Sequence, residues 1–309
     1  MATIAAPSRL ARWWDGDIAW SFRHSPVAVV SAIVLALCLG AALFAPWVAP
    51  HNPFDLATLN LSDALTPPHG MEGAKPEYLL GTDDQGRDVL SAIMFGTRIS
   101  LLVGALAVAL SVAMGVSLGL ASGYSGGRVD AFIMRAADVQ LSFPAILIAL
   151  LIDGVARAVL PRSAHSDLAL FVLVLSIGVS NWPQYARTVR GSTLVEKNKE
   201  YVQAARVIGV RPAAIVFRHL LPNVLGPVLV LATINIATAI VLEATLSFLG
   251  VGVPPTRPSL GTLIRVGNDF LFSGEWWITI FPGAALVILV LAINLLGDWL
   301  RDALNPKLK

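Results

Sequence analysis

Six stretches of the chain are apolar enough and long enough to cross a lipid bilayer, and they constrain the fold more than any other feature. A bilayer-crossing helix needs about 20 predominantly apolar residues. The third stretch is the shortest and contains Pro144, and the fifth holds Asn235 and Glu243. The predicted spans are residues 27–49, 99–121, 138–152 (extending toward 159), 168–186, 224–251 and 276–296. The sequence therefore predicts an all-α integral membrane protein with six transmembrane helices.

The composition supports a membrane protein and gives no sign of a nucleic-acid partner. The chain is 56% hydrophobic and 14% charged, whereas a soluble domain is about 45–50% apolar and about 25% charged. A net charge of +2 is too small to indicate nucleic-acid binding. The one cysteine, Cys38, lies in an apolar run, so it forms no intramolecular disulfide and is interpreted as buried packing.

The placement of Lys and Arg predicts the orientation, because cytoplasmic segments carry an excess of these residues. With the N-terminus inside, 15 of the 22 basic residues fall on the cytoplasmic side, seven of them in residues 187–222. Both termini are therefore expected to be cytoplasmic. The predicted parts are a cytoplasmic segment 1–26, the first span 27–49, an extracytoplasmic segment 50–98, a five-helix core 99–298 that includes the loop 187–222, and a cytoplasmic tail 299–309.

Two segments outside the spans carry further signals. Residues 9–26 mix Arg with Trp13, Trp14 and Trp20, a composition typical of a helix lying in the membrane interface, although an irregular polar leader is an alternative. In the extracytoplasmic segment, Thr82-Asp83-Asp84 precedes a predicted helix over 85–95, as acidic capping residues do. Asp83, Asp84 and Asp88 could instead form a metal site, but helix capping is the favoured interpretation.

Motifs for catalysis and for nucleotide binding are missing from the sequence. It contains no G-x-x-x-x-G-K-[ST] loop, no H-E-x-x-H, no C-x-x-C and no G-x-S-x-G. The five histidines are scattered through the terminus and loops, so no metal site is expected. The chain is therefore not expected to be an enzyme or to bind a cofactor, and a partner subunit or an ion gradient must supply energy for active transport.

The basic loop 187–222 contains a pattern of two short helices. Gly209 stands where a helix C-cap needs positive φ, Pro212 suits the first turn of a second helix, and Pro222 is expected to end it. The apolar residues of the first helix recur at helical spacing: Tyr201, Val202, Ala205 and Ile208. Such a pair predicts a docking surface, the alternative being a solvated loop that the bundle covers with its own ends.

This loop resembles the EAA motif of binding-protein-dependent ABC importer permeases. Gln203-Ala204-Ala205, Gly209 and Leu221-Pro222 stand at the family spacing. Two positions depart, since Gln203 replaces the acid and His219 stands where Ile is usual. The resemblance implies that the loop forms coupling helices in a groove of a separate ATPase subunit. The residues implied in this coupling are Tyr201, Gln203, Ala204, Ala205, Ile208, Gly209, Leu221 and Pro222.

Further motifs resemble the C-type permease subunit of the dipeptide, oligopeptide and nickel family. They are residues 80–91, Gly123-Tyr124 with Asp130, residues 243–250 and the tail residues 294–306, although Asn305 departs from the usual acid. The resemblance implies a B-type permease partner, two cytoplasmic ATPases that hold ATP and Mg, an extracytoplasmic substrate-binding protein, and the bacterial inner membrane. It implies peptide substrates, the alternatives being nickel, glutathione or oligosaccharides.

Two polar residues of the fifth span are candidates for the transport path. A carboxylate in hydrocarbon is costly, so intramembrane acids usually face the bundle interior or a wet cavity. Glu243 and Asn235 lie eight residues apart, a little over two helical turns at about 3.6 residues per turn. Glu243 could line the path or could only accept hydrogen bonds from a neighbouring helix. A secondary transporter is less consistent with the sequence, because Glu243 is the only acid well inside a predicted span.

Overall fold

The computed structural model describes residues 17–55, 59–161, 165–254 and 256–303. Within these ranges the chain is helical, and the only β pairing is an isolated bridge between Thr82 and Asp88. Five helices are long and apolar enough to cross a membrane: α3 (Pro26–Leu43), α5 (Val89–Ser125), α8 (His165–Glu196), α11 (Leu221–Phe248) and α13 (Trp277–Ala303). A bent pair of helices, taken as one span, would make six.

The third predicted span is wrong as a single helix. The chain forms α6 (Gly127–Leu141) and α7 (Ala145–Val159), which meet at an angle of 95°. Proline has no backbone N–H and disfavours helical geometry in the residue before it. Pro144 therefore lies between the two helices, in an extended conformation with ψ 133° that precedes α7. We call residues 142–144 the elbow.

The helices α5 and α8 form the centre of the fold. They pack side by side over most of their length, with buried side chains such as Leu173, Ile177 and Val189 of α8 against Val108 and Leu120 of α5. Ser111 Oγ of α5 donates to the Gly178 carbonyl of α8 at 2.8 Å. This hydrogen bond fixes the register between the two helices near their midpoints.

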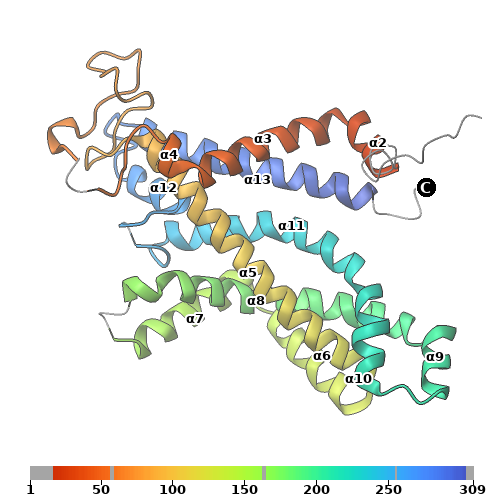
Figure 1. Cartoon of the computed structure of the whole chain (residues 1–309). Helices are drawn as coiled ribbons and strands as arrows, with labels where there is room; N and C mark the ends of the chain where they lie inside the picture. Colours follow the sequence, from red (N-terminus) through yellow and green to blue (C-terminus); the bar gives the residue numbers. More distant parts are fainter. Residues whose placement is uncertain (1–16, 56–58, 162–164, 255, 304–309) are drawn as a thin grey trace, which may run out of the picture.

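The bundle has two distinct ends (Figure 1). The segments 45–55 and 59–88 and the short helix α12 (Leu260–Asn268) lie at one end, which we call the α12 end. At the opposite end, the α9 end, lie α9 (Glu200–Val207), α10 (Pro212–Ala214) and α2 (Asp17–His24). The predicted interfacial segment thus contains a helix in its described part, while residues 9–16 lie outside the described residues.

The helix α2 is attached to the last turns of α13. Trp299 Nε1 donates to Ser21 Oγ at 3.3 Å, and the ring of Phe22 meets the Trp299 ring edge-on at 5.0 Å. The first and last described helices are therefore held together at the α9 end.

The helix predicted over 85–95 begins later, at Val89, and only one of the three acids caps it. Asp88 Oδ2 accepts from the Ser91 N–H at 2.9 Å. Asp83 instead closes a tight turn, since it accepts from the Gln85 and Arg87 amides at 2.9 Å each and pairs with the Arg87 guanidinium at 2.6 Å. Capping is thus correct for Asp88. No metal-binding group of three or more His, Cys, Asp or Glu is found among the described residues.

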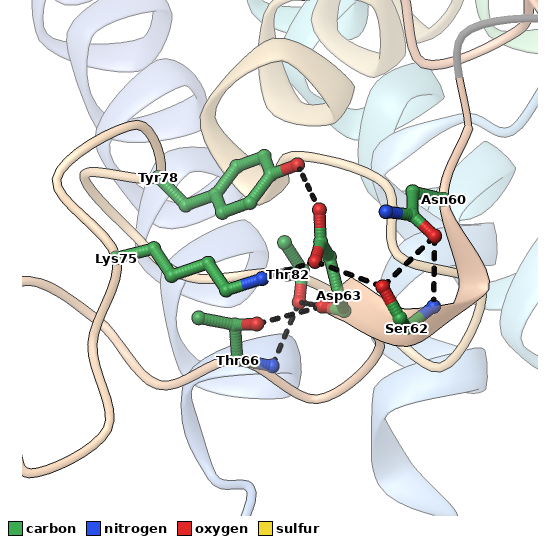
Figure 2. A network of polar contacts seen from close by, with 7 residues as sticks. All are labelled: Asn60, Ser62, Asp63, Thr66, Lys75, Tyr78 and Thr82. Atoms are coloured by element: carbon green, nitrogen blue, oxygen red, sulfur yellow. Dashed lines mark hydrogen bonds and ion pairs between the residues drawn. The ribbon is translucent and has the colours of Figure 1, made fainter.

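Asp63 organises the segment between α4 (Ala45–Val48) and α5, as Figure 2 shows. Its carboxylate pairs with Lys75 and accepts from the Tyr78 hydroxyl at 3.0 Å. Its backbone carbonyl accepts from Thr66 Oγ1 at 2.8 Å and from Thr82 Oγ1 at 2.5 Å. The hydrogen bond from Lys75 has the largest effect on the acid and holds the pKa of Asp63 below its usual 3.8.

We expect Asp63→Ala to loosen this segment without unfolding the spans. Digestion of residues 59–88 by added protease should become several-fold faster, because Lys75 and Tyr78 lose their shared acceptor. By contrast Glu72→Ala, an exposed acid on the same segment, should digest like the wild type. Since the folded-state pKa of Asp63 is lowered, its contribution is complete above about pH 4 and is lost as the pH falls through that lower value. Equal digestion of both variants would contradict this role.

Candidate functional site

The helix α9 ends as the sequence predicts. Gly209 has φ +79°, and its N–H donates to the Arg206 carbonyl at 3.1 Å, while the Val210 N–H donates to the Ala205 carbonyl at 3.0 Å. These two bonds form a Schellman motif, which needs a residue at positive φ and therefore favours glycine. The turn directs the chain back toward the bundle immediately after the helix.

The predicted docking face of α9 is divided between the bundle and the surface. Val202 and Ala205 are buried, at 0% and 5% exposure, and belong to the main hydrophobic cluster. Val207 and Ile208 are 87% and 78% exposed. The expectation that Ala205 shares an exposed face with Ile208 is therefore wrong, because Ala205 packs against its own chain. The exposed apolar surface consists of Val207 and Ile208, beside Gly209, and none of the residues that the structure describes packs over it.

Polar contacts fix the position of α9 relative to α8 and α11. The Tyr201 hydroxyl donates to Glu196 Oε2 at 2.6 Å and accepts from Asn223 Nδ2 at 3.2 Å. Burial, followed by the hydrogen bond to Glu196, raises the pKa of Tyr201 to about 12, so this hydroxyl remains a donor at any physiological pH. Gln203 Nε2 donates to the Asn198 carbonyl at 3.1 Å. Of the predicted coupling residues, Tyr201 and Gln203 thus hold the loop in place, and Ala204 is exposed beside them.

The second short helix does not end at Pro222. The helix α10 begins with Pro212 in its first turn, as predicted, and continues through a π-helical segment Ile215–Leu220 directly into α11. Pro222 lies in the first turn of α11, where the wider π turn precedes it and a missing N–H is tolerated. Leu221 is half-buried and Pro222 exposed. One continuous helical path therefore leads from Pro212 into the membrane-spanning part of α11.

An ion pair that the sequence analysis did not assign ties the base of this loop to α5 and α6. Arg190 of α8 donates to Asp130 of α6 through Nε at 2.5 Å and through its terminal nitrogen at 2.7 Å. Ser122 of α5 donates to the same carboxylate at 2.5 Å, and Lys197 donates to the Gly123 carbonyl at 2.7 Å. The sequence could have singled out Asp130, because it belongs to one of the family motifs. Its partner, Arg190, becomes visible only in the fold.

Glu243 lies in the interior of the chain, at 0% exposure. Its two carboxylate oxygens accept from Ser100 Oγ of α5 at 2.8 Å and from Ser247 Oγ of α11 at 2.7 Å. Ser100 Oγ in turn accepts from the Leu260 N–H at the start of α12, at 3.3 Å. The acid therefore joins α5, α11 and α12.

Asn235 lies apart from Glu243. It is half-buried, and its neighbour is Tyr185 of α8, not a residue of α12. Its side-chain nitrogen has no hydrogen-bond partner in the part of the chain that the structure describes. The two residues thus contact different helices, although both are directed toward this chain's own helices.

Comparison with known proteins finds similar transport permeases over nearly the whole length of this chain. Residues 115–309 match the family described as binding-protein-dependent transport system inner membrane component, and residues 13–68 match the N-terminal transmembrane domain of oligopeptide transport permease C. The dipeptide transport system permease protein DppC of Escherichia coli (strain K12) is 44% identical over 93% of this chain and 91% of its own.

Other relatives and a solved structure agree. The oligopeptide transport system permease protein OppC of Bacillus subtilis (strain 168) is 36% identical over 97% of this chain and 91% of its own. The inward-facing MetNI methionine ABC transporter contains a chain with the same fold, with a TM-score of 0.54 and 22% identity over 69% of this chain and 96% of that one. With two family matches and relatives this similar, the chain belongs to the family of binding-protein-dependent transport system inner membrane components.

Proposed function

We propose that the chain is the C-type permease subunit of an ATP-driven importer for dipeptides or oligopeptides. The names of its relatives support this substrate class. The observation that carries the coupling role is the exposed pair Val207 and Ile208 beside the Gly209 turn, at the α9 end. A hydrophobic pair that protrudes on a fixed helix is suited to a groove in a partner protein. Permeases for nickel, glutathione or oligosaccharides in the same family are the alternative.

The partners proposed are a B-type permease, with which this chain encloses the path, two cytoplasmic ATPases that hold ATP and Mg, and an extracytoplasmic binding protein. ATP would act by favouring one of two states of the ATPases. The movement would pass from α9 to α11, because α10, the π-helical segment and α11 form one continuous helix. The helix α9 is held against α8 and α11 by the hydrogen bonds of Tyr201 with Glu196 and Asn223.

The proposed setting is the bacterial inner membrane, with both termini and the α9 end in the cytoplasm. Two observations support this orientation. The basic residues are concentrated in the segments assigned to the cytoplasm. The helix α2 and the last turns of α13 lie at the same end as α9.

The coupling role is tested by Ile208→Arg in the complete importer. We expect the variant to fold and insert normally, since this side chain is 78% exposed, while ATP-driven dipeptide uptake falls about 10-fold or more, a loss equivalent to about 1.4 kcal/mol of coupling. The matched control is Phe272→Arg, an exposed apolar residue at the α12 end. Uptake, ATP hydrolysis and co-purification of the ATPases are measured for each.

The results distinguish a wrong coupling element from a wrong substrate class. If Ile208→Arg transports dipeptides and retains its ATPases like the wild type, α9 is not the coupling element. If the wild-type importer takes up none of the dipeptides offered but its binding protein captures another solute, the substrate class is wrong and the coupling test is repeated with that solute.

A further inference from the structure

The elbow lies at the level of the bundle's middle. Gln140, two residues before it, donates to the Val179 carbonyl at 2.6 Å and accepts from Trp182 Nε1 at 2.8 Å. Val179 follows Gly178, whose carbonyl binds Ser111 near the midpoint of α5. The elbow therefore interrupts a helix about half-way along the two longest packed helices, where the centre of a bilayer would lie.

The backbone of the elbow is poorly satisfied. In the part of the chain that the structure describes, no backbone amide donates to the carbonyl oxygens of Leu141, Ser142 or Phe143. The segment is also uncovered, since Phe143 is 57% exposed and both Ser142 and Pro144 are exposed. Unpaired carbonyl groups in hydrocarbon are costly, and irregular backbone occurs at membrane depth only where protein buries it or where it lines a water-filled cavity.

The surface beside the elbow is hollow and mostly apolar, with one charged residue, Arg135, in its lining. A cavity of about 510 Å³ lies along α6 and the start of α7. It is lined by Phe132, Arg135, Ala136, Val139, Gln140 and Phe143, with Ile148 of α7. The same helix α6 forms an ion pair with α8, Asp138 to Arg187 at 3.0 Å, in which both side chains are about half exposed. Asp138 lies four residues before the elbow, about one helical turn, so this exposed ion pair favours water over lipid next to the elbow.

We infer that the elbow lines the water-filled translocation path, where its free carbonyls accept hydrogen bonds from water and from the N–H groups of a passing peptide. A partner helix can satisfy these carbonyls only through donor side chains, because the N–H groups of a helix interior are already bonded within that helix. The inference rests on the proposed function, since it names a part of the transport path. It assigns this segment a preference for hydrogen-bond donors.

Single cysteines test the inference in the assembled importer. Ser142→Cys and, separately, Phe143→Cys are made in a Cys38→Ser background, which removes the chain's only natural thiol. Proteoliposomes receive a charged methanethiosulfonate reagent on both sides. Because only the hydrated thiolate reacts, we expect these cysteines to react about 10-fold faster or more than Leu37→Cys, which is 68% exposed near the middle of α3.

Each other outcome overturns the inference. Reaction with an apolar maleimide but not with the charged reagent would place the elbow in lipid, and reaction with neither would place it under a partner subunit. Dipeptide uptake by the unlabelled cysteine variants is measured in the same preparations. If the variants take up dipeptides normally but the charged reagent does not label them, the assignment of the elbow to the path is wrong and the proposed function still holds. If the parent importer takes up no peptide in the presence of ATP, the proposed function itself is wrong.

Discussion

Gly115→Val is expected to prevent assembly of a folded chain. A Cβ at position 115 would lie 2.3 Å from the Tyr185 Cβ and 2.8 Å from the Trp182 carbonyl oxygen. Both belong to α8 and are held by its backbone, so neither can move aside without separating α5 from α8. Overpacking of this kind costs about 1–3 kcal/mol for an added methyl or methylene group and more where backbone must shift.

The milder variant Gly115→Ala makes the test quantitative. We expect its melting temperature in detergent to fall clearly below that of the wild type. The matched control is Gly191→Ala, also within a long helix, where an added Cβ meets nothing within 4 Å and where alanine should stabilise the helix by up to about 1 kcal/mol. If the two alanine variants melt at the same temperature, α5 and α8 do not approach as closely as the structure shows.

Local chemistry in the sequence predicted several features correctly. Gly209 was assigned positive φ because a helix ends there, and the observed Schellman motif needs only residues 205–210. Pro212 was assigned to a first helical turn for a similar reason, since its missing N–H is not needed there. The long apolar runs predicted five helices of the observed set, because hydrophobic content over about 20 residues depends on no distant contact.

The errors arose where a local signal has two physical outcomes. A proline can break a helix or lie in a first turn, and Pro144 does the former with a 95° bend whereas Pro222 lies inside a continuous helical path. The amino-acid sequence alone predicts neither outcome, because each depends on the hydrogen bonds of the preceding turn. Ala205 was misassigned because helical spacing shows which residues share a face, but not which part of that face the bundle covers.

For Glu243 the sequence left two roles open, and the burial of the residue favours the structural one. A pathway residue would have a carboxylate reachable from one side of the membrane, but this one is enclosed by its own chain. Near this carboxylate, Gly261 of α12 lies so close to the α11 backbone that an added Cβ would be 2.4 Å from the Ala244 carbonyl oxygen. The carboxylate therefore lies where α11 and α12 are in backbone contact, with no room for a solute between them.

We therefore expect Glu243→Gln to assemble and transport like the wild type, and Glu243→Ala to fail. Glutamine keeps the shape, one acceptor oxygen and a polar nitrogen, whereas alanine leaves Ser100 and Ser247 without their shared acceptor. A buried group deprived of its partner costs about 1–3 kcal/mol, which should lower both the melting temperature and the yield of assembled importer. Thr238→Ala, an exposed hydroxyl on the same helix, is the control and should behave as the wild type.

The double variant Glu243→Ala with Ser100→Ala completes the test, because each single change removes the hydrogen bond between the two residues. Residues that share a hydrogen bond give non-additive changes in the free energy of unfolding, by about 0.5–3 kcal/mol, whereas independent sites add. Non-additivity in this cycle, together with unchanged uptake by Glu243→Gln, would establish that Glu243 holds α5 against α11. If Glu243→Gln is as stable as the wild type but its uptake rate now depends on the charge of the peptide, the carboxylate is reached by the solute, and the structural role is wrong.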